Sequence, residues 1–198
     1  MKDAKAALRK EMKARRSALA AAHPQAGEAM ASAFEARGNW PSAEVVAGFH
    51  PFGSEIDPLP LLMRFHARGY GLALPALVES AEGGQMIFCA YDPIGALVEG
   101  PYGIWQPGPD APEVFPDIIL APLLAFDREG GRLGYGGGFY DRALDYLKAA
   151  KRGKDSPLQV WGVAFSAQEV ARVPTEPHDQ RLDAVLTEQG VIEIRKNP

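Results

Sequence analysis

Cysteine is almost absent from this sequence of 198 residues, because Cys89 is the only one. A single cysteine excludes a disulfide framework within the chain and a zinc site built from several thiolates. Cys89 lies inside the apolar run 86–91, so we expect it to be a buried packing residue. The four histidines show no metal-ligand spacing and no nucleophile partner, so zinc and hydrolase chemistry are not supported.

Long apolar runs and an excess of positive charge are also missing. No stretch approaches the roughly 20 apolar residues that span a bilayer, and the N-terminal segment lacks the apolar core of a signal peptide. The formal net charge of −4 argues against a general attraction to nucleic acid or anionic lipid. We therefore expect a cytoplasmic protein with no nucleic-acid or membrane partner. Any anion site must then be built locally.

The composition that is present suits one globular domain. Hydrophobic residues make up 46% and charged residues 23% of the chain, which is close to the average for such domains. A chain of this length can bury a full core without metals or disulfides. We expect a single domain over residues 1–198.

The hydrophobic pattern alternates between helical segments and short apolar runs. Helices are predicted over 3–20, 26–37, 58–68 and 139–150. Strands are predicted over 45–49, 72–75, 86–91, 117–121, 160–165 and 184–186. Several of these strands are continuously apolar, as strands covered on both faces tend to be. The predicted fold is α/β, with three αβα layers and a mainly parallel or mixed central sheet. The stretch 95–116, rich in proline and glycine, is interpreted as a loop over a site.

The first predicted helix carries a row of cations. Lys5, Arg9 and Lys13 follow one another at four-residue steps and share one face. A solvated helix surface is one interpretation of this row. A contribution to a local anion site is the other.

The most informative segment follows the predicted strand 117–121 and runs into the helix that starts at Phe139. It reads Phe126-Asp-Arg-Glu-Gly-Gly-Arg-Leu-Gly-Tyr-Gly-Gly-Gly-Phe-Tyr-Asp141. Glycines let the backbone approach a ligand and turn its N–H groups inward, and the helix N-terminus adds positive potential. Neither the P-loop nor the dinucleotide pattern matches, because Phe139 and Tyr140 stand where lysine, serine or a third glycine belongs. The segment predicts a phosphate loop, with a flexible turn as the alternative.

Two charged residues flank this loop. Arg132 at its entrance offers the planar guanidinium fork that suits phosphate. Asp141, in the first turn of the predicted helix, would repel a bound phosphate unless a cation lay between them, and Mg²⁺ is the natural bridge. The alternative is that Asp141 only offsets the helix dipole.

These residues resemble the signature of the 5-formyltetrahydrofolate cyclo-ligase family. The resemblance rests on Arg132-Leu-Gly-x-Gly-x-Gly-Phe-Tyr-Asp141 and the preceding Asp117-Ile-Ile-Leu-Ala-Pro-Leu-Leu-Ala-Phe-Asp127. It extends to Lys5 and Arg9, to Pro51-Phe-Gly-Ser-Glu-Ile-Asp57, and to Val173-Pro-x-Glu-x-His-Asp179, Leu182-Asp183 and Thr187-Glu188. The resemblance thus covers nearly the whole chain. Gly137 is a departure, because some members carry lysine at this point.

The resemblance implies sites for ATP, folate and a metal ion. The residues implied to bind ATP are Lys5, Arg9, Arg132, Leu133, Gly134, Tyr135, Gly136, Gly137, Gly138, Phe139 and Tyr140. Those implied to bind the folate are Glu55, which would contact the pterin, with His50, Phe52, Met86, Trp105 and Tyr135. Arg132 and Glu55 are the implied catalytic residues, and Asp141 and Asp183 are implied to hold Mg²⁺. Core packing is the alternative for Phe52, Met86 and Trp105, and an ordinary strand-end histidine is the alternative for His50.

The implied activity is ATP-dependent conversion of 5-formyltetrahydrofolate to 5,10-methenyltetrahydrofolate, with release of ADP and phosphate. ATP would phosphorylate the formyl oxygen, N10 would attack the activated carbon, and phosphate would leave. We expect a monomer with ATP as co-substrate, Mg²⁺ as cofactor and no macromolecular partner. Two alternatives remain open: a different enzyme on a similar α/β scaffold, such as a sugar-phosphate isomerase, and a non-catalytic binding module that keeps the pocket, with RNA as a partner.

Overall fold

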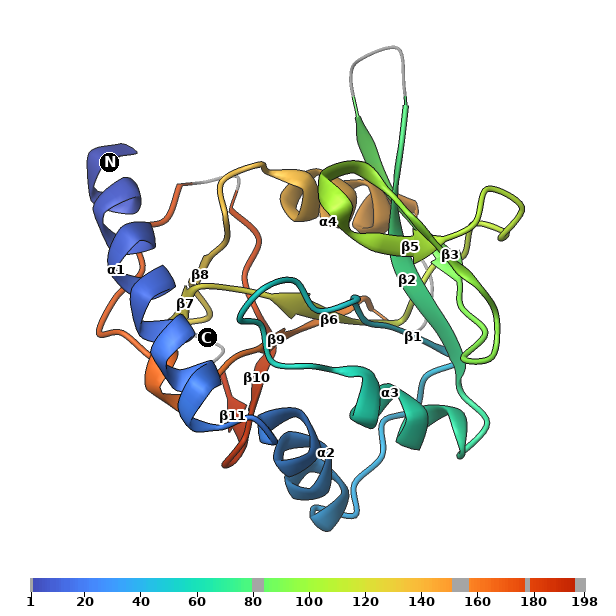
Figure 1. Ribbon diagram of the computed structural model, residues 1–198, viewed down its shortest axis with the longest axis horizontal. Helices are drawn as coiled ribbons and strands as arrows, with labels where there is room; N and C mark the ends of the chain where they lie inside the picture. Colours follow the sequence, from blue (N-terminus) through green and yellow to red (C-terminus); the bar gives the residue numbers. More distant parts are fainter. Residues whose placement is uncertain (1, 80–83, 151–156, 177–178, 195–198) are drawn as a thin grey trace.

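The computed structural model describes residues 2–79, 84–150, 157–176 and 179–194 (Figure 1). The helices are α1 (Lys2–Ala22), α2 (Ala26–Ala36), α3 (Leu59–His66) and α4 (Phe139–Ala150), with 3₁₀ turns η1 (Pro101–Gly103) and η2 (Ser166–Gln168). The strands are β1 (Val45–Ala47), β2 (Gly71–Val78), β3 (Gln85–Ala90), β4 (Leu97–Glu99), β5 (Trp105–Pro107), β6 (Ile118–Pro122), β7 (Ala125–Phe126), β8 (Arg132–Leu133), β9 (Gln159–Val163), β10 (Ala184–Thr187) and β11 (Gly190–Glu193).

One mixed sheet forms the centre of the molecule, with the strand order β11-β10-β9-β6-β1-β2-β3. Neighbouring strands from β10 to β2 are parallel, whereas β11 and β3 pair antiparallel at the two edges. In β1, Val46 pairs with Leu72 on one side and Ile118 on the other. The central strands are covered on both faces, which explains their continuously apolar sequences.

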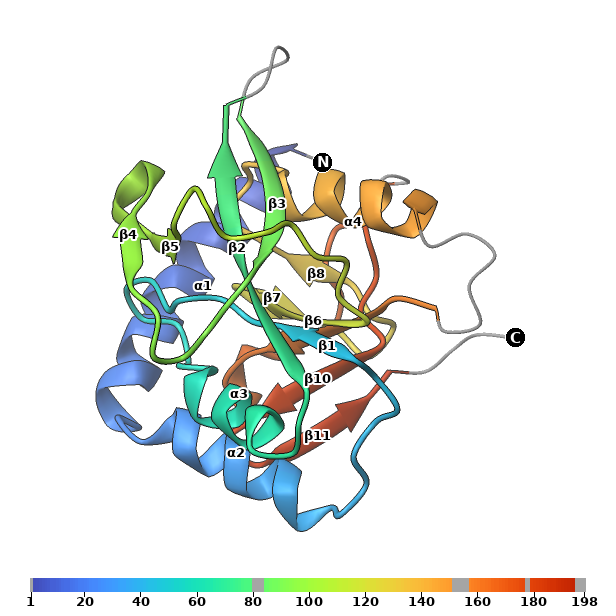
Figure 2. The same ribbon diagram turned by 90° about the vertical axis from the view of Figure 1, so that its right-hand side faces the viewer.

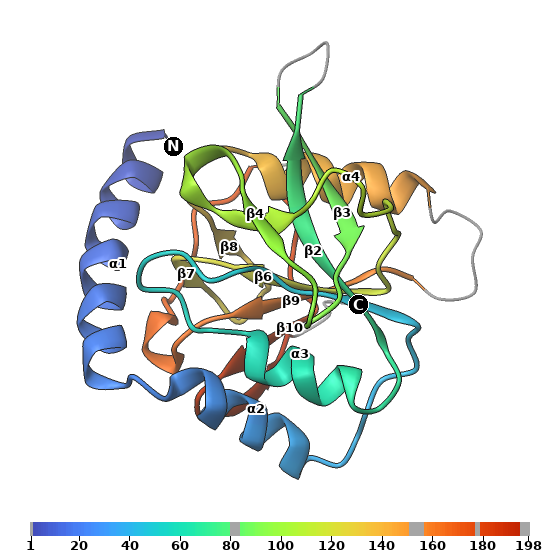
Figure 3. The same ribbon diagram turned by 45° about the vertical axis from the view of Figure 1, so that its right-hand side comes forward.

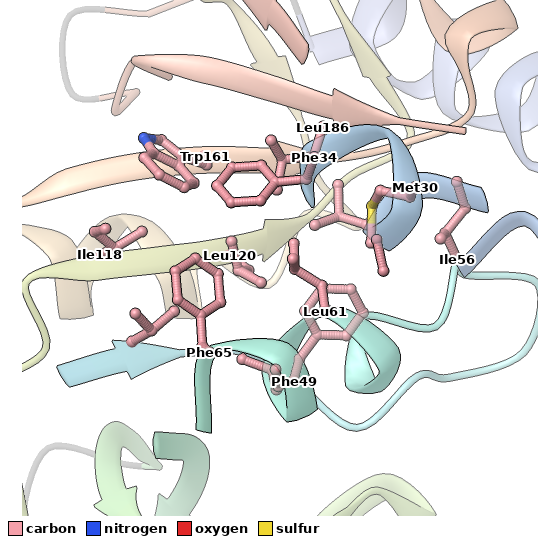
Figure 4. Close-up of a cluster of buried hydrophobic side chains, with 14 of the residues drawn as sticks. Met30, Phe34, Phe49, Ile56, Leu61, Phe65, Ile118, Leu120, Trp161 and Leu186 are labelled. Atoms are coloured by element: carbon pink, nitrogen blue, oxygen red, sulfur yellow. The ribbon is translucent and has the colours of Figure 1, made fainter. Parts of the chain in front are cut away.

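Helices cover both faces of this sheet (Figure 2). On one face, below α2 and α3, Phe34 makes tilted ring contacts with Phe65 and Trp161 (Figure 4). On the other face, α4 buries Leu144 and Leu147, which lie one turn apart on its apolar stripe. The predicted three-layer αβα fold with a mixed sheet is confirmed.

α1 lies outside these layers, beside the short hairpin of β7 and β8 (Figure 3). Met12 is fully buried against Leu124, Leu133 and other apolar residues of this region. Most of the remaining α1 side chains are exposed, but Lys5 and Arg16 are buried. Buried cations are costly unless they find acceptors, so their contacts show what α1 is docked against.

The predicted helices agree with the observed ones to within a few residues, and α4 has the predicted bounds. The stretch 95–116 differs from the predicted loop, because β4 and β5 form a hairpin within it, connected by η1. Each of these strands has only three residues, which is too short to give a recognisable period-2 pattern. None of the described helices is long and apolar enough to cross a membrane.

Candidate nucleotide and folate site

The chain changes direction between β1 and β6. From β1 it passes through α3 to β2 on one side, whereas from β6 it passes through α4 to β9 on the other side. Open α/β sheets bind ligands in the crevice at the carboxyl ends of the strands on either side of such a point. The segments that follow β1 and β6, residues 48–57 and 123–138, therefore mark the place where a site is expected.

Arg16 on α1 joins these two segments. Its Nε donates to Ser54 Oγ at 3.0 Å, and its Nη1 donates to the Leu123 carbonyl oxygen at 3.3 Å. Nη2 donates to the Tyr135 hydroxyl in the glycine loop 134–138. Nη1 also lies 3.5 Å from Glu55 Oε1, and both side chains are buried. A helix distant in sequence thus closes one wall of the crevice.

Glu55 is the buried carboxylate of this crevice. Its Oε2 accepts a hydrogen bond from the Phe52 N–H at 2.9 Å. Burial raises the pKa of Glu55 above its ordinary value, and the Phe52 N–H and the charge of Arg16 oppose this shift without cancelling it. A carboxylate in this setting is a strong acceptor for the N–H groups of a ligand.

The glycine loop has a conformation that requires glycine at two positions, because Gly136 and Gly138 have φ values of 102° and 67°. The loop is also packed tightly against α1. Arg9 Nε donates to the Gly134 carbonyl oxygen at 3.0 Å, and a Cβ added to Gly136 would lie 3.1 Å from Arg9 Cζ. A guanidinium group therefore lies directly on the loop backbone.

Arg132 on β8 is buried beside the first turn of α4. Its Nη2 donates to Asp141 Oδ1 at 2.7 Å, and its Cζ lies 5.5 Å from the centroid of the Tyr140 ring. Burial, followed by the charge of Glu55, raises the pKa of Tyr140 well above its ordinary value, so its hydroxyl keeps its proton. Within the described part of the chain, neither Arg132 Nε nor the Tyr140 hydroxyl has a hydrogen-bond partner.

Lys5 provides a further cation from α1. Its Nζ donates to Glu176 Oε2 at 2.9 Å and to Asp179 Oδ2 at 2.6 Å. Burial lowers the pKa of Lys5, but these two carboxylates outweigh that effect and the net shift is upward. The next residue, Gln180, donates its N–H to Asp141 Oδ1 at 3.3 Å, so the acidic segment reaches the first turn of α4. Cations and carboxylates are paired along this side of the crevice.

Known proteins share this sequence and fold. The family model described as 5-formyltetrahydrofolate cyclo-ligase family matches residues 1–188. The chain belongs to this family. The 5-formyltetrahydrofolate cyclo-ligase of Escherichia coli (strain K12) is 37% identical over 155 residues, which cover 76% of this chain and 81% of that protein. The cyclo-ligase of Mycolicibacterium smegmatis is 34% identical over 163 residues, which cover 78% of this chain and 79% of the relative.

Solved structures of related proteins agree with this assignment. The structure of 5,10-methenyltetrahydrofolate synthetase from Aquifex aeolicus has a TM-score of 0.76 at 30% identity, and the match covers 98% of this chain and 94% of that one. The corresponding synthetase from Mycoplasma pneumoniae, at 20% identity, has a TM-score of 0.68 and shows the same fold. The cyclo-ligase family predicted from the sequence is confirmed.

The structure brings together many of the residues expected for a cyclo-ligase. Arg9 contacts the glycine loop directly, and Arg132 lies between Tyr140 and Asp141. The charge of Glu55 acts on the Tyr140 hydroxyl, so these two groups lie near each other. Their roles in binding ATP and folate remain predictions.

Asp183 does not lie where it could share a metal ion with Asp141. Its Oδ2 accepts a hydrogen bond from the Val160 N–H at 2.9 Å, at the amino end of β9, and Asp183 lines a cavity of about 610 Å³ with Phe34 of α2. α4, which carries Asp141, covers the opposite face of the sheet from α2. This placement does not favour one Mg²⁺ held by both Asp141 and Asp183, and the metal ligands remain a prediction. Within the described ranges, no cluster of three or more histidine, cysteine or acidic side chains is arranged to hold a metal ion.

The weaker folate candidates fall into different environments. Met86 is buried in the core below α4, which agrees with the packing alternative. Phe52 and Trp105 are each 46% exposed, so neither is a core residue and both remain candidates for the pocket wall. His50 is partly buried on the segment that also carries Glu55.

The contacts at the crevice add Arg16, Glu176 and Asp179 to the candidate site residues expected from the sequence. The signal for Arg16 was available, because residues 5, 9, 12 and 16 recur at helical spacing and share a face. Met12 and Arg16 continue the buried face that begins with Lys5, whereas Lys13 is exposed. Glu176 and Asp179 lie in the C-terminal segment that carries the family resemblance, but only the fold shows their contact with Lys5.

The raised pKa of Glu55 predicts a specific pH dependence of stability. A carboxyl whose pKa is raised in the folded state binds more protons when folded than when unfolded. Its contribution to the free energy of unfolding is therefore fully present below the ordinary glutamate pKa and is lost as the pH rises through the raised pKa. The free energy of unfolding of the wild type, relative to Glu55→Gln, should therefore fall across this window. Denaturant unfolding at several pH values measures it, with the exposed Glu11→Gln as control. A difference between wild type and Glu55→Gln that is independent of pH would contradict it.

Proposed function

We propose that the chain catalyses ATP-dependent conversion of 5-formyltetrahydrofolate to 5,10-methenyltetrahydrofolate, with release of ADP and phosphate. Membership of the cyclo-ligase family supports this activity. The observation that carries the proposal in this chain is the pair of buried donors, Arg132 Nε and the Tyr140 hydroxyl, that have no acceptor among the described residues. Buried donors without acceptors cost free energy, and the oxygens of a transferring phosphoryl group would satisfy both.

ATP is proposed to lie on the glycine loop, where backbone N–H groups and the N-terminus of α4 favour phosphate. Arg9, Lys5 and Arg132 supply the positive charge that no loop lysine provides, since position 137 is glycine. Lys5 and Arg132 are each paired with carboxylates, so a bound polyphosphate competes with those carboxylates for the two cations. The arrangement favours a ligand of high negative charge.

Mg²⁺ is proposed to be held by Asp141 together with Asp179, in place of Asp183. The donor set fits, because Mg²⁺ takes one or two carboxylates and completes its octahedron with phosphate oxygens and waters. The two carboxylates come from segments joined by the hydrogen bond from the Gln180 N–H to Asp141 Oδ1. When bound, the ion supplies neutralisation of the phosphate charge.

The folate is proposed to lie on the other side of the crevice. Glu55 would accept hydrogen bonds from the N–H groups of the pterin, and the half-exposed rings of Phe52 and Trp105 would cover its faces. The rings can do this only because neither is buried in the core.

In this reaction the protein mainly has to align the formyl oxygen with the γ-phosphate and to neutralise the charge of the phosphates. The formyl oxygen takes the γ-phosphoryl group and ADP leaves; N10 then attacks the formyl carbon and loses its proton, and the bond from that carbon to the phosphate oxygen breaks. Arg132 and the Tyr140 hydroxyl are proposed to bind the transferring group, where charge changes most. Glu55 would hold the pterin so that the formyl oxygen faces the γ-phosphate.

The proposed function predicts that ADP and methenyl product form in equal amounts, and only when both substrates are present. Purified protein with Mg²⁺ and ATP is assayed for ADP with and without 5-formyltetrahydrofolate, while absorbance follows the methenyl product. Hydrolysis of ATP that is indifferent to the folate would point to another phosphate enzyme. Binding of either ligand without turnover would point to a non-catalytic module.

A methyl group on Gly136 should disturb the phosphate loop more than one on Gly134. At Gly136 the added Cβ lies close to the Arg9 guanidinium, and the positive φ strains any residue with a side chain by about 1–3 kcal/mol. At Gly134 no atom beyond the chain neighbours lies within 4 Å of the added Cβ. We expect Gly136→Ala to lower kcat/KM for ATP roughly tenfold or more, in proportion to that strain, and Gly134→Ala to leave it near the wild-type value. Steady-state kinetics at varied ATP decides between them. Equal effects of the two substitutions would show that the loop conformation does not matter.

Asp141→Asn separates metal binding from helix capping. If Asp141 only offsets the helix dipole and pairs with the buried Arg132, the amide should lower the stability and leave the Mg²⁺ dependence of turnover unchanged. If it binds Mg²⁺, turnover should fall by about 10–100-fold or more and recover partly at high Mg²⁺. Asp179→Asn should behave in the same way, whereas Asp183→Asn should not, because its side chain still accepts from the Val160 N–H. A Mg²⁺-dependent defect in Asp183→Asn would restore the original pairing.

A further inference from the structure

Arg16 is a buried cation with no assigned role. It is 3% exposed, although it lies on a helix that is otherwise mostly solvated. Removing a guanidinium from water costs several kcal/mol unless its donors are satisfied. Arg15, the preceding residue on α1, is exposed and pairs with Glu11 on the same helix. The two adjacent arginines therefore lie in different environments.

The N–H groups of the Arg16 guanidinium contact three separate segments of the chain. Nε contacts Ser54 on the segment after β1, Nη1 contacts the Leu123 carbonyl oxygen after β6, and Nη2 contacts the Tyr135 hydroxyl in the glycine loop. The guanidinium also lies 5.2 Å from the centroid of the Tyr135 ring. An arginine that is buried only for packing does not need contacts with both the proposed folate side and the proposed phosphate side of one crevice.

We propose that Arg16 is a positioning residue that holds the Glu55 carboxylate and the Tyr135 side chain in a fixed relation, and thereby joins the folate side of the crevice to the phosphate loop. The proposal rests on the proposed function. Arg16 acts through these neighbours and does not need to touch a substrate. Its fork is suited to this role, because a planar group with several donors fixes two partners at once.

The electrostatic part of the role follows from the groups that face Glu55. Among the described residues these are Arg16 on α1, Tyr135 in the loop and Tyr140 on α4. Arg16 is the only cation of this set, and an opposite charge at such a distance favours the ionised carboxylate. Without it, burial would leave Glu55 protonated over a wider pH range.

Arg16→Met tests the proposal, with Arg15→Met as the matched control on the same helix. Loss of the cation should raise the pKa of Glu55, so the acidic limb of kcat/KM for the folate should move upward by about 1 to 3 pH units in Arg16→Met. The limb should stay in place in Arg15→Met. A residue needed only for packing would lower the melting temperature and leave the pH profile unmoved, and that result would overturn the proposal.

A readout without turnover keeps this inference apart from the proposed function. The carboxylate carbon of Glu55 is titrated by NMR, with its signal assigned by its loss in Glu55→Gln. An upward shift of the Glu55 pKa in Arg16→Met supports the action of Arg16 on Glu55, whatever the turnover. Absence of folate-dependent turnover in the wild type would contradict the proposed function and leave this inference standing. An unchanged titration overturns the inference whatever the activity.

Tyr135→Phe keeps the proposal testable if Arg16→Met does not fold. Tyr135 is 42% exposed, so removal of its hydroxyl leaves the core intact. We expect KM for the folate to rise severalfold and the acidic limb to move upward by less than expected for Arg16→Met, because the hydroxyl that hydrogen-bonds Glu55 is lost but the cation beside it is retained. Tyr146→Phe, on the exposed side of α4, is the control. A wild-type KM in Tyr135→Phe would show that the link between loop and folate side is absent.

Discussion

The burial of cations from α1 is the constraint on which the site depends. A buried guanidinium or ammonium group must find acceptors, and among the described residues the acceptors of Lys5 and Arg16 lie on segments of the crevice. Lys5 finds Glu176 and Asp179, Arg9 finds a loop carbonyl, and Arg16 finds the residues around Glu55. α1 is thus docked by the same contacts that shape the site, with Met12 as its apolar anchor.

The sheet determines where these contacts can meet. The change of direction between β1 and β6 leaves two strand ends side by side, and each is followed by a segment that carries part of the chemistry. After β1 comes the carboxylate Glu55; after β6 come Arg132 and the glycine loop, whose positive φ values turn the backbone towards the first turn of α4. The proposed folate side and the proposed phosphate side therefore follow two neighbouring strands of one sheet.

The fold and the position of the glycine loop before α4 were predictable because both leave local patterns. The continuous apolar runs indicated a covered sheet, and the run from Arg132 to Asp141 indicated a loop before a helix. The structure does not favour the pairing of Asp141 with Asp183 for a physical reason: a carboxylate just before a parallel strand can also satisfy an amide near the start of the neighbouring strand, as Asp183 does for Val160. Only tertiary contacts distinguish that role from metal binding, just as only they show that Arg16, and not Lys13, continues the buried face of α1.

The pairing of charges also explains why the crevice should respond to both ligands together. Lys5 is paired with Asp179, and Arg132 is paired with Asp141. Phosphate oxygens that bind these two cations would release the two carboxylates, whose oxygens are the ligands that a divalent cation needs. Under the proposed function, ATP and Mg²⁺ would then be favoured jointly over either one alone. On the folate side, Arg16 keeps the charge of Glu55 matched and contacts the loop through Tyr135. Under the proposed function, α1 therefore carries cations directed at both the nucleotide, through Arg9, and the folate side, through Arg16.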